Sequence, residues 1–484
     1  MKVIRPILVL VVGVLAFLPF YGGYEAQRAY VDLVDGMRMG TRGQMGVESE
    51  FHRGWLRSTA VTRLVGTSPE DPLGIALHHT FIHGPIPFGE LLRGRLPTSF
   101  ALAIVETDYR PDFAERSPWK EGLDGRPLVR FRTTVEPGAW IKTVVESPAT
   151  HVETVDGELT WEGIHGTVIA TRDFETFSGV IEAPSLELRS GGEVLRLRDA
   201  SLEFDNETTA NGLLDGAFVL SLAELSVESA GGSGGGFLLR NWSFHETSDE
   251  DLAFDTYEIR VGTAFEEAVI DGDRFGPGAI EVALRNLQAS GLRELGEQLE
   301  ALAEQRQGHQ EAAFSPLNVH MDALPKLVAL SPEIVLTRFE LVSEGGELSG
   351  TARIGIDGEK ARGMPMHLFL PMAVEADASI FVPATMFHRL AEVFLMSISG
   401  NDGPIPPNQT RLDLKAQAAL SRSQLVDSLL EAGYVAREGG GYRVRLRLRD
   451  GQLWLNGRPA GFGGSSPADA PSDEPGSMAL AFPR

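Results

Sequence analysis

Cysteine is absent from this 484-residue chain. Without a thiol the protein forms no disulfides, has no thiolate metal site or cysteine nucleophile, and carries no lipid-modified cysteine. Positive charge is also scarce, because 43 lysines and arginines stand against 67 acidic residues and give a formal net charge of −24. That is the wrong sign for a surface that must neutralise phosphates, so nucleic acid is excluded as a global partner.

Long apolar runs are rare as well, and residues 6–24 form the single run of membrane-spanning length. The run is close to the ~20 residues that cross a bilayer, and no small-residue cleavage site follows it. It therefore predicts an uncleaved transmembrane anchor, and Lys2 and Arg5 before it predict a cytoplasmic N-terminus. A cleaved signal peptide is the alternative, because Gly13 and Pro19 weaken the helix.

The chain is rich in short stretches that alternate apolar and polar residues. In the clearest stretch, Arg443–Arg449, arginines alternate with Val444, Leu446 and Leu448, and Asp450-Gly451 follows as a turn. This pattern predicts a hairpin with one buried and one solvated face.

Similar patterns recur upstream. They predict a hairpin that turns at Asp156-Gly157, a pair of strands at 185–189 and 195–198, and a further turn at Asp199 into a strand at 201–204. We therefore expect a mainly β fold, built of extended, curved antiparallel sheets with a few packed helices behind one N-terminal transmembrane helix.

Helical periodicity is limited to four amphipathic stretches, at residues 286–307, 317–330, 383–399 and 421–434. From these patterns we expect four regions along the chain. They are a cytoplasmic start and anchor (1–24), a β-rich exported region (25–285), a β-rich region with several helices (286–460) and a flexible tail rich in glycine, serine and proline (461–484).

The sequence contains formal matches to catalytic and metal-binding motifs, but the residues around them do not fit these functions. Gly231–Gly235 matches the nucleophile elbow of hydrolases, yet a strand-like stretch follows it where the elbow requires a helix. The acidic clusters at 249–251 and 271–273 lack the ligand spacing of a calcium loop and are expected to be solvated turns.

Three histidines lie close together at 78, 79 and 83. In a strand, His79 and His83 share a face with Phe81, but a closed metal site needs further ligands, and no carboxylate or thiolate follows at ligand spacing. We expect structural histidines next to a turn at Gly84-Pro85, and overall no catalytic, cofactor-binding or metal-binding residues.

The four arginines of 443–449 depart locally from the acidic balance. On one strand face their guanidinium groups could bind phosphate groups of lipid or lipopolysaccharide. They could equally pair with acidic residues of neighbouring strands, such as Asp413. The sequence leaves both interpretations open.

Several segments together resemble the YdgA-like family of bacterial envelope proteins. These segments are residues 50–58 (EFHRGWLRS), 83–85 (HGP), 331–336 (SPEIVL), 346–350 (GELSG) and 450–457 (DGQLWLNG). The resemblance implies an inner-membrane anchor with the N-terminus in the cytoplasm, a periplasmic body and, for some members, a homodimer. The family has no established catalytic residues to carry over.

The shared residues also have physical roles of their own. Gly54 beside Trp55 suggests a bulge or tight bend, with the indole filling the space. Gly345-Gly346 and Asn456-Gly457 are typical of turns. We expect all of these positions to have structural roles and none to be catalytic.

Two functions remain. The first is a membrane-tethered periplasmic structural or interaction protein of the cell envelope, without catalysis. The second is a carrier or scaffold that binds lipid or another apolar envelope molecule in a β-sheet groove.

Overall fold

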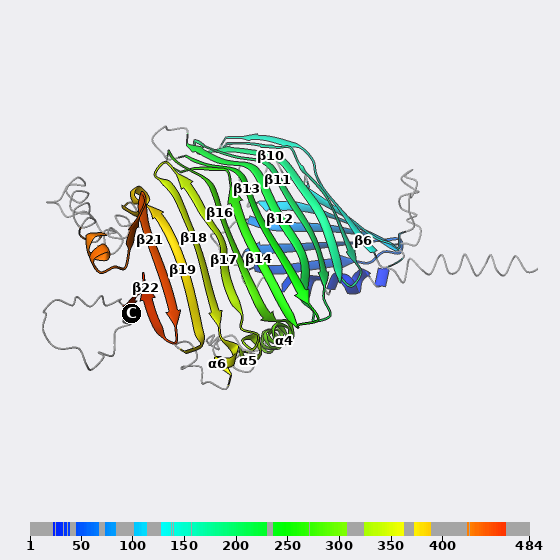
Figure 1. Cartoon of the computed structure of the whole chain (residues 1–484). Coiled ribbons are helices and arrows are strands. Elements are labelled where there is room, and N and C mark those ends of the chain that lie inside the picture. Colours follow the sequence, from blue (N-terminus) through cyan, green and yellow to red (C-terminus); the bar gives the residue numbers. More distant parts are fainter. Residues whose placement is uncertain are drawn as a thin grey trace, which may run out of the picture. The chain divides into compact units, whose positions relative to one another are not determined.

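The computed structural model describes residues 23–38, 45–66, 73–83, 101–113, 127–229, 236–306, 324–362, 372–388 and 424–460, except 25, 32, 36, 137, 139, 156, 271 and 425. Most of these residues lie in antiparallel strands, which confirms the mainly β fold (Figure 1). Within this part of the chain, no helix combines the length and the apolarity needed to cross a bilayer. Residues 6–22 of the predicted anchor and the predicted tail lie outside the described residues.

The chain groups into two compact units. Unit 1 comprises the described residues of 1–210, 214–247 and 265–273, and unit 2 those of 211–213, 248–264 and 274–484. The boundary expected after residue 285 stays a prediction.

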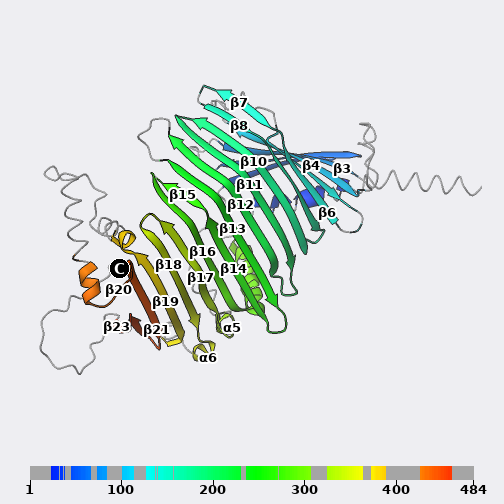
Figure 2. The same ribbon diagram turned by 45° about the horizontal axis from the view of Figure 1, so that its top comes forward.

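Unit 1 consists mainly of antiparallel strands. They are β1 (Met45–His52), β2 (Arg57–Gly66), β3 (Leu73–His83), β4 (Ala103–Phe113), β5 (Val129–Val135), β6 (Trp140–Ser147), β7 (Thr150–Thr154), β8 (Gly157–Trp161), β9 (Ile164–Thr171), β10 (Thr176–Ser190), β11 (Glu193–Thr208), β12 (Leu214–Ser229), β15 (Glu267–Ile270) and most of β13 (Phe237–Asp251). In the sheet, β1 to β6 pair in chain order, β6 pairs with β9, and the order continues through β10 and β11 to β12 (Figure 2). The predicted hairpin β7–β8 adds to the far half of β10.

A short helical segment packs on the first strands of unit 1. Residues 26–31 and 33–35 are helical, and Tyr30 and Val34 from this segment are buried against Ala60 and Phe81. This contact ties the chain that follows the predicted anchor to β2 and β3.

The turn expected at Asp199 is wrong, because residues 193–208 form one continuous strand, β11. Asp199 has a φ of 47°, in the left-handed region. Apolar residues occupy odd positions before it, such as Leu197, and even positions after it, such as Leu202. The pairing of β11 with β10 and β12 keeps the same register on both sides of Asp199, so the change of phase marks a left-handed residue inside a continuous strand and not a chain reversal.

Unit 2 continues the antiparallel architecture with a few helices. Its elements are β14 (Thr256–Phe265), β16 (Asp273–Gln288), α4 (Ala289–Arg306), α5 (Leu324–Leu327), β17 (Glu333–Ser343), β18 (Gly346–Ile356), α6 (Gly358–Ala361), β19 (Val374–Pro383), β20 (Ala436–Glu438), β21 (Gly441–Arg449), β22 (Gln452–Leu455) and β23 (Arg458–Ala460). Its strands pair in the order β16, β17, β18, β19, β21, β22 and β23, and Figure 1 shows β17 to β21 side by side.

The predicted hairpins of unit 2 are confirmed. Strand β21 reverses into β22 through Asp450 and Gly451, whose φ angles are 50° and 72°. Two consecutive positive φ angles define the type I′ turn that matches the twist of a two-residue hairpin. The reversal at Asn456-Gly457 is also present, and the one expected at Gly345-Gly346 turns one residue earlier, through Glu344 and Gly345.

The predicted helices are confirmed only in part. Residues 286–288 belong to β16, so the helix expected from 286 begins at Ala289. Of the stretch 317–330, the described helix is α5. Residues 384–388 and 426–431 are helical, and residues 389–399 and 421–423 of those stretches lie outside the described residues.

The bend at Gly54 lies in the loop that joins β1 and β2. A Cβ atom at this position would lie 2.1 Å from the carbonyl oxygen of Arg57, so the loop requires glycine. Trp55 is 56% exposed, so the expectation that its indole fills the space is wrong. The hairpin closes tightly, and its tryptophan points to solvent.

Candidate functional site

The sheet of unit 2 has two chemically different faces. Cross-strand partners share a face, and the strand register places Val335, Arg353, Asp377, Arg447 and Trp454 in one row across β17, β18, β19, β21 and β22. The arginines of β21 all lie on this face, because side chains alternate along a strand.

The arginines of β21 pair with acids of neighbouring strands, as one of the two interpretations predicts. Glu438 contacts Arg443 at 2.8 Å and Arg445 at 3.3 Å. Arg447 Nε lies 2.9 Å from Asp377 Oδ1. Asp413, the partner suggested by the sequence, lies outside the described residues.

A groove of about 970 Å³ runs over this charged face. Its charged lining residues are Arg353, Asp377, Arg445, Arg447 and Arg449, and Trp454 lies beside them. We call it the arginine groove. Its volume is that of a small-molecule site. Four arginines and one aspartate line it, and acids outside the lining pair with three of these arginines.

The opposite face is apolar. The residues that flank the charged row form a second row with one member on each of six strands, which we call the apolar strip: Leu284, Ile334, Ile354, Ala376, Leu448 and Leu453. A parallel apolar row lies two residues further along: Val282, Leu336, Ala352, Ala378, Leu446 and Leu455. Ile334 and Ile354 are cross-strand neighbours and remain 49% and 48% exposed. This face is therefore incompletely covered.

Sequence reasoning found the arginines of β21 but missed Arg353 and Trp454 as parts of the same groove. Both lie in stretches that alternate apolar and polar residues, and this alternation places them on the face opposite the apolar one. That they share one row across the sheet depends on the register of strands almost one hundred residues apart, and alternation does not predict register.

In unit 1, His79 and His83 share one face of β3, as predicted. Ser58 Oγ lies 2.9 Å from His83 Nε2, and both side chains are buried. Thr62 Oγ1 lies 3.2 Å from His79 Nε2 and 2.8 Å from the Tyr30 hydroxyl. Both imidazoles are thus held by hydroxyl groups of β2.

Burial keeps these imidazoles neutral. Desolvation, with a smaller contribution from His78, lowers the pKa of His79 to about 4. Burial also lowers the pKa of His83. Neutral imidazoles hydrogen-bonded to buried hydroxyls fit the structural role expected from the sequence. The turn at Gly84-Pro85 lies outside the described residues.

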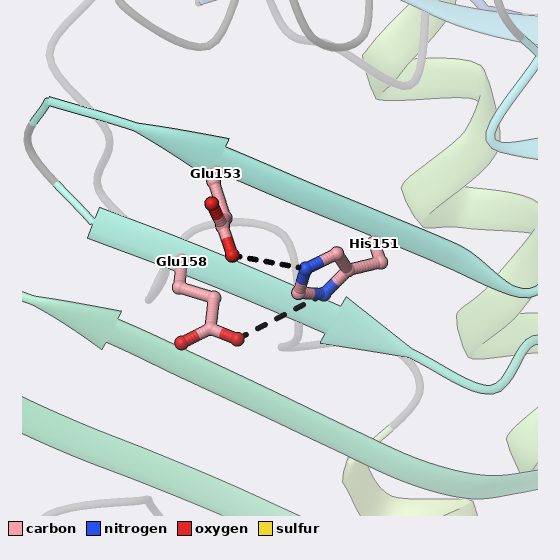
Figure 3. Close-up of side chains that lie close together, drawn as sticks. All are labelled: His151, Glu153 and Glu158. Atoms are coloured by element: carbon pink, nitrogen blue, oxygen red, sulfur yellow. Dashed lines mark ion pairs between the residues drawn. The ribbon is translucent and has the colours of Figure 1, made fainter.

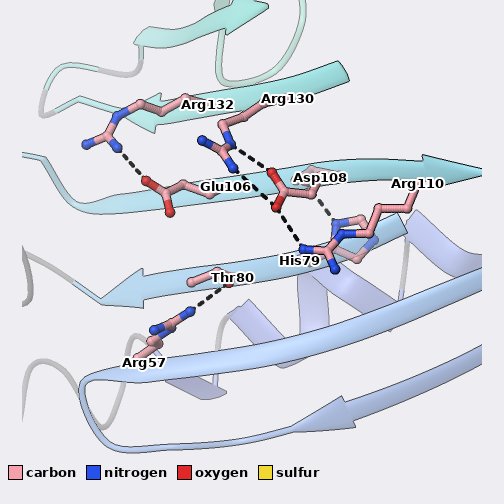
Figure 4. A network of polar contacts seen from close by, with 9 residues as sticks. Arg57, His79, Thr80, Glu106, Asp108, Arg110, Arg130 and Arg132 are labelled. Carbon is pink, nitrogen blue, oxygen red and sulfur yellow. Dashed lines mark hydrogen bonds and ion pairs between the residues drawn. The ribbon is translucent and has the colours of Figure 1, made fainter. Parts of the chain in front are cut away.

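An ion-pair network lies on β4 and β5 (Figure 4). Arg130 Nε donates to Asp108 at 2.7 Å, and Arg110 contacts the other oxygen of this carboxylate at 3.3 Å. Burial opposes ionisation of Asp108, but the hydrogen bonds and charges of the two arginines outweigh it and lower the pKa of its carboxyl. These residues form a cross-strand ion-pair network of the kind that stabilises a sheet, in which Arg110 Nε is buried without a hydrogen-bond partner.

His151, Glu153 and Glu158 come together on the β7–β8 hairpin (Figure 3). Their nearest ligand atoms lie within 4.8 Å of one another. His151 and Glu153 are exposed, the imidazole faces both carboxylates, and Arg189 lies 3.7 Å from Glu158. The arginine already compensates part of the acidic charge, so the group reads as a surface ion-pair cluster.

The remaining motifs show no catalytic arrangement among the described residues. Ser233 and Asp271 lie outside them. Asp251 accepts a hydrogen bond from the Ala253 amide at 2.9 Å, as a turn residue does. The expectation that all of 249–251 is solvated is wrong, because Glu250 is buried and bonded to Asn211.

Comparison with curated proteins and with solved structures finds no match. A family model described as a bacterial protein of unknown function, DUF945, matches residues 1–460. This match covers nearly the whole chain and both units, so the protein belongs to the bacterial family DUF945.

Proposed function

We propose that this protein is a membrane-tethered periplasmic protein of the bacterial cell envelope, and that it acts by binding an apolar envelope molecule, not by catalysis. The apolar strip is the observation that supports this proposal. Lipid is the ligand class that its chemistry favours, because the strip offers only aliphatic side chains.

The dimensions of the apolar strip suit an acyl chain. Neighbouring strands lie ~4.8 Å apart, so six strands give a strip roughly 24 Å long. One leaflet of a bilayer core is ~15 Å thick, which is the length of an extended acyl chain within it. The strip therefore exceeds the length of one acyl chain.

The two exposed isoleucines give an energetic reason for an apolar ligand to bind along the strip. Ile334 and Ile354 each leave about half of their surface in water. Covering such surface gains ~25 cal/mol per Å², which favours an apolar ligand along the strip. The N-terminal anchor would keep this surface close to the membrane from which lipid is drawn.

The test is the lipid content of the full chain, purified from membranes in a mild non-ionic detergent and measured by native mass spectrometry. We expect bound lipid in near-stoichiometric amount, reduced at least threefold in the I334S/I354S variant. Val155→Ser, which alters a 96% exposed residue at a hairpin tip, should leave the lipid content unchanged.

A lipid-free homodimer would contradict the carrier function. It would favour the other candidate, an interaction protein whose second copy covers the same strip. The two outcomes differ in mass, so one spectrum separates them.

A further inference from the structure

We propose that the arginine groove is a binding site for a phosphate-bearing organic ligand. It lies on the face of the unit 2 sheet opposite the apolar strip, so this site goes beyond the proposed lipid carriage and does not depend on it. Four arginines and one acid, Asp377, are among the described residues that line the groove, and Glu333, Glu438 and Glu375 outside this lining pair with Arg353, Arg445 and Arg449. The site therefore depends on the N–H donors that these ion pairs leave unused.

The guanidinium groups retain donors for a ligand. Arg445, Arg447 and Arg449 are 59%, 69% and 65% exposed at their side chains. Each makes one close contact with a carboxylate, and a guanidinium carries five N–H donors in a fixed fork. The carboxylates therefore orient the arginines without saturating them.

The spacing of these arginines suits a multidentate anion. They occupy alternate positions of β21, so their Cα atoms lie ~6.7 Å apart. Long side chains from two such positions can converge on one phosphate group, which accepts several hydrogen bonds on its oxygens. Arg353 from β18 lies in the same row as Arg447, on the other side of Asp377.

Hydroxyl groups extend the donor set across the floor of the groove. Thr351 and Ser379 are cross-strand partners, and both line it. Ser379 Oγ accepts a hydrogen bond from Arg443 at 3.2 Å, so its own proton is available for donation. Arginine forks combined with hydroxyl donors are typical of phosphate recognition.

Charge and volume narrow the ligand class. A phosphate monoester carries about −1.5 to −2 charges at pH 7 and three acceptor oxygens, so it can take up more of the unused N–H donors of the arginines than one carboxylate can. The groove, at about 970 Å³, is far larger than one phosphate group. The remaining volume would hold the organic part of the ligand, beside Trp454 and Val335.

The test is isothermal titration calorimetry on the full chain, in an uncharged detergent that contains no phosphate. The two probes are glycerol 3-phosphate and dihexanoyl phosphatidic acid below its micelle-forming concentration. We expect at least one probe to bind, with a loss of affinity of tenfold or more in R445Q/R447Q. Binding of both probes indicates a soluble phosphate as the source, and binding of the phosphatidic acid alone indicates a lipid headgroup.

Matched variants keep the test specific. Arg338→Gln removes an arginine of the same sheet that pairs with Glu340 outside the groove, and it should leave the affinity unchanged. Thr351→Trp keeps every arginine and fills the groove, and it should abolish binding. The I334S/I354S variant of the apolar strip should still bind through the groove, which separates this proposal from lipid carriage. Absence of binding for both probes, or equal losses in R445Q/R447Q and R338Q, would overturn the proposal.

Discussion

At the scale of single residues, His79 makes the fold sensitive to acid. The unfolded imidazole has a pKa of ~6.5, whereas burial lowers the pKa in the folded protein to about 4. The unfolded state therefore takes up a proton first as the pH falls. Stability from this residue is complete above pH 6.5 and declines between pH 6.5 and 4, by about 3 kcal/mol in total.

Thermal unfolding of the full chain between pH 7.5 and 4 tests this prediction. His79→Gln can keep the hydrogen bonds to Thr62 and Thr107 but cannot titrate, so the decline should be smaller in the variant. A remainder is expected from His78 and His83, whose pKa values burial also lowers. The exposed His165→Gln is the control. An unchanged decline in H79Q would contradict the assignment.

Sequence reasoning at this scale recovered the shared face of the histidines but not their partners. The alternation along 78–83 places His79 and His83 together. Ser58 and Thr62 become their neighbours only through the pairing of β2 with β3, with Ser58 opposite Phe81. Serine and threonine give no sequence pattern of their own. The hydrogen bonds between these hydroxyl groups and the buried histidines could therefore be identified only from the structure.

At the scale of elements, Asp199 places a left-handed residue inside β11, one of the longest strands of unit 1. A β-branched side chain in the left-handed region is strained by roughly 1–2 kcal/mol, whereas glycine adopts it freely. We expect Asp199→Val to lower the stability by about that amount and Asp199→Gly to leave it nearly unchanged. Urea unfolding followed by circular dichroism measures both.

Asp205→Val is the matched control, because Asp205 lies in the same strand and is not among the residues with positive φ. A valine there should be tolerated. Equal losses in D199V and D205V would mean that charge, and not backbone conformation, accounts for the effect.

The hairpins were predictable because their signals are local. Asp450-Gly451 and Asn456-Gly457 encode two reversals within a few residues. The prediction failed at Asp199 because a change of phase in the alternation can mark either a turn or a left-handed residue inside a continuous strand. Pairing of β10 with β11 in one register on both sides of this position, from Glu193 to Glu207, identifies the continuous strand.

At the scale of the whole molecule, the structure places two features of the sequence, the basic stretch and the aliphatic residues that alternate with it. The lone basic stretch of an acidic chain lines the arginine groove, and the aliphatic residues that alternate with it form part of the apolar face. One strand, β21, thus contributes to both proposed surfaces. Alternation predicted the division of faces, whereas the extent of each surface follows from strand register.

Lipid held along the apolar strip is tested most directly by photo-crosslinking in intact cells, with a benzophenone amino acid at position 354 on the strip and, as control, at position 155 on the exposed tip of the β7–β8 hairpin. We predict lipid adducts on the full chain at position 354 and few at position 155. Equal adducts at both positions, or crosslinks at position 354 only to protein, would contradict lipid binding at the strip.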